Sequence, residues 1–195
     1  MQITKAEFKC SSERISQVPK DGLKDIAFIG RSNVGKSSLI NMLTARGGLA
    51  KVSGTPGKTR LVNHFRINDA WYLVDLPGYG YAKVSKAERD RWGRLMENYF
   101  QSAGLIDLGV LIVDARHKPT ADDVTMREWF RGSGCPMVVV ANKLDKLKRS
   151  EIEPNLALIR ETLDLGPDDV LVPFSAEKGE GKDALITALA GHLKR

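Results

Sequence analysis

Residues 30–37 read Gly-Arg-Ser-Asn-Val-Gly-Lys-Ser and fit the phosphate-binding pattern GxxxxGK[ST]. An apolar run at residues 26–29 precedes this stretch, and a helix-forming run at residues 38–43 follows it. In a strand–loop–helix unit of this kind, glycines let the backbone point its N–H groups at phosphate oxygens, and the helix start adds partial positive charge. The stretch therefore predicts a phosphate-binding loop, with an ordinary glycine turn as the alternative.

The last two residues of the loop carry most of its expected chemistry. Lys36 is expected to reach the β- and γ-phosphates of a nucleotide. Ser37 offers a hydroxyl to Mg²⁺, a hard cation that prefers oxygen ligands. The residues predicted to surround the phosphates are Gly30, Arg31, Ser32, Asn33, Val34, Gly35, Lys36 and Ser37.

A second motif, Asp75-Leu76-Pro77-Gly78, directly follows an apolar run at residues 71–74. DxxG alone is a weak signal, but after a phosphate-binding loop its aspartate can hold a magnesium-bound water. The backbone N–H of Gly78 can then sense a γ-phosphate, so residues 79–85 are expected to respond to the nucleotide state.

A loop at residues 54–60, Gly-Thr-Pro-Gly-Lys-Thr-Arg, lies between these two motifs. It can swing a threonine onto Mg²⁺, but its chemistry does not choose between Thr55 and Thr59, and a plain surface turn is the alternative. The predicted nucleotide contacts here are Gly57, Lys58, Thr59, Arg60 and Leu61, and those after the second strand are Asp75, Leu76, Pro77 and Gly78.

A third motif, Asn142-Lys143-Leu144-Asp145, follows the apolar run at residues 137–141 and predicts the choice of base. The Asp145 carboxylate can accept hydrogen bonds from guanine N1 and N2, whereas adenine would leave it unpaired. Sites of this kind reject an analogue lacking the donor by roughly 10⁴ to 10⁵. The Lys143 stem can cover one face of the ring; a charged surface turn is the alternative. The predicted base contacts are Asn142, Lys143, Leu144, Asp145, Phe174, Ser175 and Ala176.

The apolar runs also predict the fold, because each is followed by a helical or turn signal. Such alternation favours a mostly parallel sheet with helices on both faces. Residues 62–67 read as an additional strand, joined through Asn68 and Asp69 to the next strand as a hairpin. We therefore expect an α/β fold with a six-stranded sheet and one antiparallel edge strand. The five other predicted strands are residues 26–29, 71–74, 110–113, 137–141 and 170–174.

Two helices carry start signals of the capping-box type, Ser85 with Glu88 and Ser150 with Glu153. Each signal precedes a helically spaced apolar stripe that should face the sheet. The first stripe is Trp92, Leu95, Met96, Tyr99 and Ala103, and the second is Ile152, Leu156, Ile159 and Leu163. We interpret both stripes as packing surfaces and not as ligand sites.

Composition excludes several other classes of protein. The chain has 195 residues, 42% hydrophobic and 28% charged, which is typical of one globular domain. Its apolar runs are far shorter than the ~20 residues of a membrane span, and charges within the first ten residues argue against a secretory signal. Cys10, Cys135 and the three histidines show no metal-ligand spacing. We therefore expect a cytoplasmic protein with incidental thiols.

Taken together, these stretches resemble the EngB (YihA/YsxC) family of bacterial GTPases. GRSNVGKSSLIN, TPGKTR, DLPGYGYA, NKLD and FSAEKGEG stand in that family's order and cover about residues 23–195. Residues 1–22 are then an N-terminal extension packed on or leading into the domain. The resemblance implies a Ras-like G domain that binds GTP or GDP with Mg²⁺, with roles in large ribosomal subunit assembly, cell division and septation.

The resemblance also implies roles for individual residues. It makes Thr59 a direct magnesium ligand beside Ser37. Together with the motif analysis, this gives Ser37, Thr59 and Asp75 as the expected metal-site residues, and Lys36, Thr59 and Gly78 as the residues expected to act in hydrolysis. Ras-type proteins have a water-orienting glutamine after DxxG, but Tyr79 stands here, so slow turnover is expected. Asn33 matches a feature of potassium-stimulated GTPases, which makes K⁺ a candidate cofactor.

Two functional hypotheses remain open. In the first, a monomer docks on the large ribosomal subunit or its RNA in the GTP state and leaves after hydrolysis. Residues 26–68 contain seven basic and no acidic residues, and more basic residues, Lys83, Lys86, Arg89, Arg91 and Arg94, follow the second motif. A solvated helix face is the alternative for that basic group. In the second hypothesis, the chain is a protein-binding switch of the division machinery without RNA contact. No DNA partner is predicted.

Overall fold

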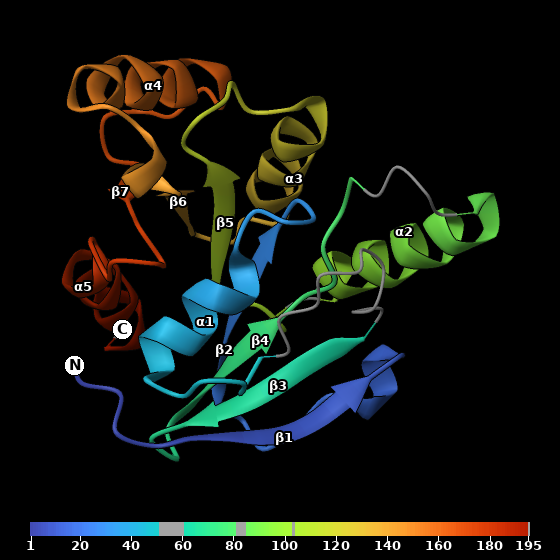
Figure 1. Cartoon of the computed structure of the whole chain (residues 1–195). Helices are drawn as coiled ribbons and strands as arrows, with labels where there is room; N and C mark the ends of the chain where they lie inside the picture. The colour runs from blue at the N-terminus through green and yellow to red at the C-terminus, as the bar shows by residue number, and fades with distance from the viewer. Residues whose placement is uncertain (51–60, 81–84, 103, 195) are drawn as a thin grey trace.

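The structure is a computed structural model that describes residues 1–50, 61–80, 85–102 and 104–194. Within these residues the chain forms a seven-stranded mixed sheet, in the order β1-β3-β4-β2-β5-β6-β7, with helices on both faces (Figure 1). The strands are β1 (Ala6–Ser12), β2 (Lys24–Gly30), β3 (Val62–Ile67), β4 (Trp71–Asp75), β5 (Leu108–Asp114), β6 (Met137–Asn142) and β7 (Val170–Pro173). The helices are α1 (Lys36–Thr44), α2 (Lys86–Gln101), α3 (Ala121–Gly132), α4 (Arg149–Thr162) and α5 (Lys182–Leu193), with 3₁₀ turns η1 (Ile15–Gln17) and η2 (Leu144–Lys146). The predicted α/β architecture is confirmed.

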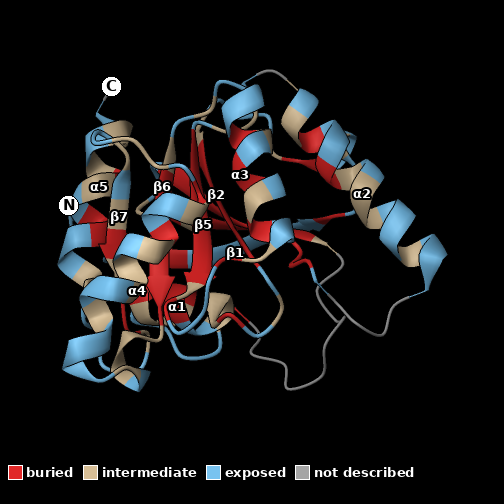
Figure 2. Cartoon of the chain, turned by 90° about the horizontal axis from the view of Figure 1, so that it is seen from above, coloured by how far each residue is buried: buried red, intermediate tan, exposed pale blue. Residues whose placement is uncertain are grey.

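Strands β4, β2, β5, β6 and β7 run parallel to one another and correspond to the five predicted apolar runs. Helices cover both faces of β4, β2, β5 and β6, so their side chains are buried almost without interruption, as Figure 2 shows in red. In β7, at the edge of the sheet, only Val172 is buried. Because the strands are parallel, their carboxyl ends meet at one edge, where ligands of open α/β sheets bind.

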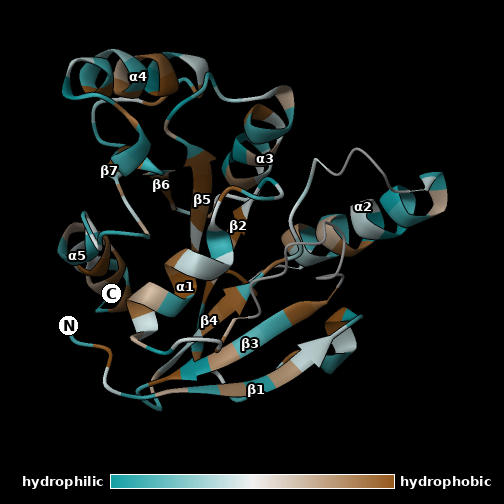
Figure 3. Cartoon of the chain, in the orientation of Figure 1, coloured by the Kyte–Doolittle hydropathy of each residue, from teal (hydrophilic) through white to brown (hydrophobic). Residues whose placement is uncertain are grey.

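The two faces of the sheet form separate apolar cores. Helices α1 and α5 pack on one face through side chains such as Leu39 and Leu185. Helices α2, α3 and α4 pack on the other through side chains such as Tyr99, Phe130 and Ile159. The brown central strands in Figure 3 contribute to both cores, which holds the carboxyl edge of the sheet in place.

The predicted strand count and edge were wrong, because β1 adds a seventh strand outside β3. β3 is antiparallel to both of its neighbours, so it lies inside the sheet and β1 forms the edge. In β1 only Ala6 and Ser12 are buried, and Phe8 is 57% exposed. β1 is held by backbone pairing with β3, and most of its side chains are exposed. Its sequence therefore has no alternating apolar pattern from which a strand could be predicted. The division of the chain after residue 22 stays a prediction.

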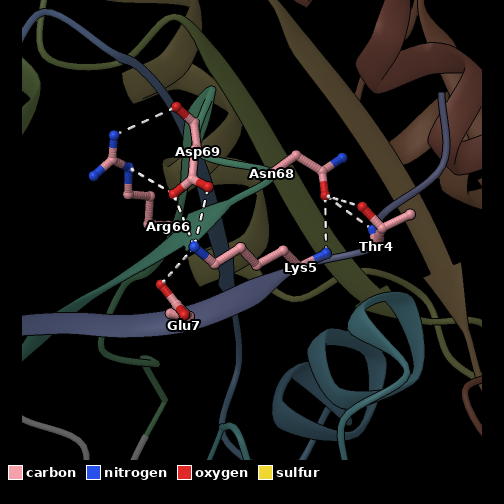
Figure 4. Close-up of polar contacts among 6 residues, drawn as sticks. All are labelled: Thr4, Lys5, Glu7, Arg66, Asn68 and Asp69. Atoms are coloured by element: carbon pink, nitrogen blue, oxygen red, sulfur yellow. Dashed lines mark hydrogen bonds and ion pairs between the residues drawn. The ribbon is translucent and has the colours of Figure 1, made fainter.

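The hairpin between β3 and β4 is confirmed and also anchors the N-terminal segment. Asn68 and Asp69 have φ values of 50° and 55°, and the Ala70 N–H donates to the Ile67 carbonyl oxygen at 2.9 Å, so they are the central residues of a β-turn with positive φ at both positions. The Asn68 side-chain oxygen accepts the backbone N–H groups of Thr4 and Lys5 at 2.9 and 3.0 Å (Figure 4). The Lys5 ammonium lies 3.0 Å from an Asp69 carboxylate oxygen, so one turn fixes the start of β1.

The start of α2 follows the prediction. The Ser85 hydroxyl accepts the Glu88 N–H at 3.2 Å, and the Glu88 carboxylate accepts the Ser85 N–H at 3.0 Å. On its stripe, Met96 and Tyr99 are buried, whereas Trp92 and Leu95 are partly buried. Ala103 lies outside the described residues.

The predicted start of α4 was wrong by two residues. The Glu151 carboxylate accepts the Lys148 N–H at 2.7 Å, and α4 begins at Arg149, so Ser150 lies inside the first turn. The carboxylate that reaches back to the cap must stand at the third helical position, which is Glu151 and not Glu153. None of the helices in the described part of the chain is long and apolar enough to cross a bilayer.

Candidate nucleotide-binding site

The loop between β2 and α1 has the strand–loop–helix form that residues 30–37 predict. A Cβ atom on Gly30 would lie 2.7 Å from the Ile112 carbonyl oxygen, so no larger residue fits there. Gly35 has φ 95°, and a Cβ on it would lie 2.4 Å from the Asn142 amide nitrogen. Both glycines are therefore needed for the loop to pass this close to its neighbours.

The phosphate loop and the second motif meet at one ion pair. The Lys36 ammonium contacts the Asp75 carboxylate, and both side chains are nearly buried. Asp75 is the last residue of β4, which is the direct neighbour of β2. Ser37 follows Lys36 in α1, so its hydroxyl and the Asp75 carboxylate at the end of β4 are the oxygen donors next to this ion pair, and such donors suit Mg²⁺. Thr59, the third predicted metal ligand, lies outside the described residues.

Tyr79, directly after Gly78, ties the second motif to the phosphate loop and to α3. Its carbonyl oxygen accepts the Ser32 N–H at 2.8 Å, and its buried hydroxyl donates to an Asp123 carboxylate oxygen at 2.5 Å. Burial, together with the Asp123 charge, raises the pKa of Tyr79 well above its usual range. The hydroxyl therefore stays protonated, and its proton is used in the hydrogen bond to Asp123. Sequence reasoning missed this pairing, since no local pattern links positions 44 residues apart.

Helix α2 contacts the same motif through Trp92. Its indole N–H donates to the Pro77 carbonyl oxygen at 3.0 Å, and its ring lies edge-on to Tyr79 with centroids 6.4 Å apart. Pro77 precedes Gly78, so the residue predicted to sense a γ-phosphate lies between contacts to α2 and α3.

Asp145, the residue predicted to bind guanine, is a buried carboxylate with two polar partners. One oxygen accepts the Ser175 hydroxyl at 2.6 Å, and the other lies 3.1 Å from the Lys146 ammonium. The hydrogen bond from Ser175 lowers the pKa of Asp145 despite its burial, and the side chain is only 4% exposed. The group is therefore ionised at neutral pH and can accept two further N–H donors.

Asn142 links three parts of the site. Its amide nitrogen donates to the Val34 carbonyl oxygen at 2.9 Å, and its amide oxygen accepts the Ala176 N–H at 3.1 Å. The residue is 1% exposed, so these bonds form away from water. Asn142 therefore braces the phosphate loop against the segment after β7, and its predicted base contact stays a prediction.

Lys143 lies across the site, with its ammonium 2.7 Å from the Asn33 carbonyl oxygen and 3.1 Å from an Asp114 carboxylate oxygen. Burial would raise the pKa of Asp114, but hydrogen bonds from Arg116 and Lys143 outweigh it and lower the pKa well below its usual range. Asp114 was missed in the sequence, although its place directly after the buried run at residues 110–113 was a usable signal.

The described parts of all the predicted motifs gather at the carboxyl edge of β2, β4, β6 and β7. Phe174 is buried beside the third motif, and its carbonyl oxygen accepts the Leu144 N–H at 3.0 Å. Leu61 lies just before β3. The predicted contacts that fall outside the described residues are Gly57, Lys58, Thr59 and Arg60, together with Thr55 and Lys83.

Comparison with known proteins identifies the family. The family of 50S ribosome-binding GTPases matches residues 25–143, and the GTP-binding domain of elongation factor Tu matches residues 95–195. A probable GTP-binding protein EngB of Clostridium beijerinckii is 56% identical over 189 residues, which cover 97% of this chain and 96% of that protein. This chain belongs to the EngB family.

Solved structures agree with this family membership. The crystal structure of a probable GTP-binding protein EngB has a TM-score of 0.73 and 27% identity, and the match covers 87% of this chain and 98% of that one. Era in complex with MgGDPNP and nucleotides 1506–1542 of 16S ribosomal RNA has a TM-score of 0.65 and 26% identity. That match covers 87% of this EngB chain and 56% of Era.

Proposed function

We propose that this EngB chain is a cytoplasmic, monomeric GTPase that binds GTP or GDP with Mg²⁺ and acts as a nucleotide-dependent switch in large ribosomal subunit assembly. The observation that supports the proposal most strongly is that Lys36, Asn142 and Asp145 lie along the carboxyl ends of the strands. Each is held there by a polar contact, with Asp75, Val34 and Ser175 respectively. The Lys36 ammonium, proposed to bind phosphates, lies at one end of this edge, and the buried Asp145 carboxylate, proposed to bind guanine, lies at the other.

Guanine recognition is assigned to Asp145, because its ionised carboxylate retains unused acceptor capacity. Asp145→Asn replaces one acceptor oxygen with a donor, which matches the oxygen that xanthine carries at position 2. The variant should bind GTP more weakly and xanthosine triphosphate more tightly, as measured by calorimetry on nucleotide-stripped protein with Mg²⁺. Unchanged GTP affinity would remove the base-site assignment.

Phosphate binding is assigned to Lys36 and to the backbone N–H groups of residues 30–37. Lys36 has three donors, so it can bind phosphate oxygens. Ser37, Thr59 and Asp75 would hold Mg²⁺, which neutralises phosphate charge when bound. Lys36, Thr59 and the N–H of Gly78 are the groups proposed to act on the γ-phosphate.

We propose slow hydrolysis because of the environment of Tyr79. Its hydroxyl is buried against Asp123 and so cannot orient an attacking water as a glutamine does. We further propose that K⁺ bound near Asn33, an exposed residue of the phosphate loop, raises turnover. GTP turnover should be faster in potassium chloride than in equal sodium chloride, and equal rates would remove the potassium proposal.

The ribosomal role draws on the family and on charge. The matching family is described as 50S ribosome-binding, and Era has been solved with a ribosomal RNA segment. Cosedimentation of the chain with large subunits, in GTP-bound, GDP-bound and nucleotide-free states, tests it. Binding that depends on nucleotide and weakens steeply with salt is expected. No binding in any state would favour a protein-binding switch of the division machinery. The need for this chain in division and septation is part of the proposal.

A further inference from the structure

A groove of about 1450 Å³ lies between α2 and α3, with η1 on its border. Figures 1 and 2 both show the start of α2 projecting outward from the body of the molecule. We propose that this groove binds an unpaired ribosomal RNA segment, with guanidinium groups on its phosphates and tryptophan rings against its bases. The proposal rests on the ribosomal role above and names the surface that performs it.

Four arginines give the groove its affinity for phosphate. Arg89, Arg91 and Arg94 belong to α2, and Arg14 is the residue before η1. All four are exposed, and none forms an ion pair with another described residue. Guanidinium groups in this state are available for bidentate bonds to phosphate.

The acidic side chains of the groove leave the arginines in excess. They are Glu13, Glu88 and Asp122, and the Glu88 carboxylate already accepts the Ser85 N–H at the start of α2. The four arginines are therefore opposed by three carboxylates, one of which caps a helix.

Two tryptophans supply the aromatic surface. Trp92 of α2 and Trp129 of α3 stack with their ring centroids 6.4 Å apart and their planes 21° apart, and both line the groove. Both are partly exposed, unlike Trp71, which is 2% exposed in the sheet core. Partly exposed aromatic faces beside arginines are the combination that unpaired RNA bases use for stacking. A duplex keeps its bases stacked and so gains nothing from the rings.

The groove is also connected to the nucleotide site. Trp92 donates to the Pro77 carbonyl oxygen, and Tyr79 and Gly78 line the groove directly. A movement of Gly78 in response to the γ-phosphate would therefore change the lining of the groove that contacts the RNA. RNA affinity is expected to differ between the GTP-bound and GDP-bound protein.

The test uses the full chain, bound to a non-hydrolysable GTP analogue or to GDP. A labelled 12-nucleotide uridine RNA is titrated by fluorescence anisotropy over a range of salt concentrations, with an RNA duplex for comparison. Arg89→Glu/Arg94→Glu removes two groove cations, and Arg149→Glu/Arg160→Glu, at exposed positions of α4, makes the same change in net charge.

The groove variant should bind the single strand at least roughly tenfold more weakly, and its log–log salt slope should fall by about 2. The α4 control should stay within about twofold of the parent. Trp129→Leu should weaken binding roughly 5- to 100-fold and reduce the quenching of tryptophan fluorescence by RNA. Circular dichroism confirms that each variant is folded.

Several outcomes would overturn the proposal. They are equal losses in the groove and α4 variants, preference for the duplex, no uridine RNA binding by the parent chain, or equal RNA affinity in the two nucleotide states. If the groove variant loses large-subunit binding but keeps uridine RNA binding, the occupant is a ribosomal protein and the RNA assignment is wrong. Failure of the parent chain to bind large subunits refutes the proposed function itself, so the two failures are distinguishable.

Discussion

Asn142→Ala tests whether one buried amide holds the phosphate and base halves of the site together. The Asn142 side chain makes two hydrogen bonds to backbone groups, at 2.9 Å to Val34 and 3.1 Å to Ala176, and is 1% exposed. Its removal forfeits two bonds of about 1 kcal/mol each and leaves a buried carbonyl and N–H without a partner. The expected loss in free energy of unfolding is about 3 kcal/mol.

For a domain of this size, that loss corresponds to a fall in Tm of roughly 6–12 °C. Urea unfolding and thermal scans of the nucleotide-free protein measure it. Asn155→Ala is the matched control, because its amide makes one bond, 2.9 Å to the Ala115 carbonyl oxygen, at a half-buried position. The control should lose about 1 kcal/mol.

Nucleotide affinity separates a brace from a merely stabilising residue. If Asn142 positions the phosphate loop against the base site, Asn142→Ala should weaken GTP binding by roughly tenfold or more at a temperature where it is fully folded, whereas Asn155→Ala should not. Equal stability losses in the two variants, or unchanged GTP affinity in a folded Asn142→Ala protein, would refute the reasoning.

Three further variants probe other contacts. Tyr79→Phe should lower the free energy of unfolding in urea by about 1–3 kcal/mol, because it leaves the buried Asp123 carboxylate without its 2.5 Å donor. Gly109→Ala should destabilise β5 by about 1–3 kcal/mol or more in the same assay, since the added Cβ would lie 2.2 Å from the buried Phe130 ring. Burial raises the pKa of Asp25, so the folded state holds that proton longer, and stability from this group falls as pH rises through its folded pKa. Asp25→Asn should therefore gain stability relative to the parent between pH 4 and pH 7, and a difference that does not change with pH would contradict this.

The sequence predicted those parts of the fold in which side-chain burial follows chain order. The four inner parallel strands, β4, β2, β5 and β6, are covered on both faces, so each appears as an apolar run. The hairpin at Asn68 and Asp69 has its own turn chemistry. β1 could not be predicted in this way, because its backbone pairs with β3 while side chains such as Phe8 face solvent. Edge strands of this kind depend on a partner that is distant in sequence.

The site, like the fold, has parts that the sequence predicts and parts that it does not. Motif spacing predicted that residues 30–37, Asp75 and Asp145 would lie at one edge, because strand ends converge there. It could not predict that Asn142 would bond Val34, or that Lys143 would reach Asp114. Those pairs depend on how far β2, β5 and β6 extend relative to one another at the carboxyl edge. Strand register determines this, and sequence spacing does not.

Tyr79 shows why the missed contacts bear on function as well as on packing. Its backbone carbonyl bonds the phosphate loop at Ser32, while its hydroxyl bonds Asp123 at the start of α3. Asp123 in turn accepts the Thr120 N–H at 2.7 Å in the α3 cap. A residue held at both ends cannot turn its ring toward an attacking water without releasing α3. The proposed slow hydrolysis and the proposed connection between nucleotide and groove both depend on these two hydrogen bonds. A change that frees the Tyr79 ring should therefore alter both together.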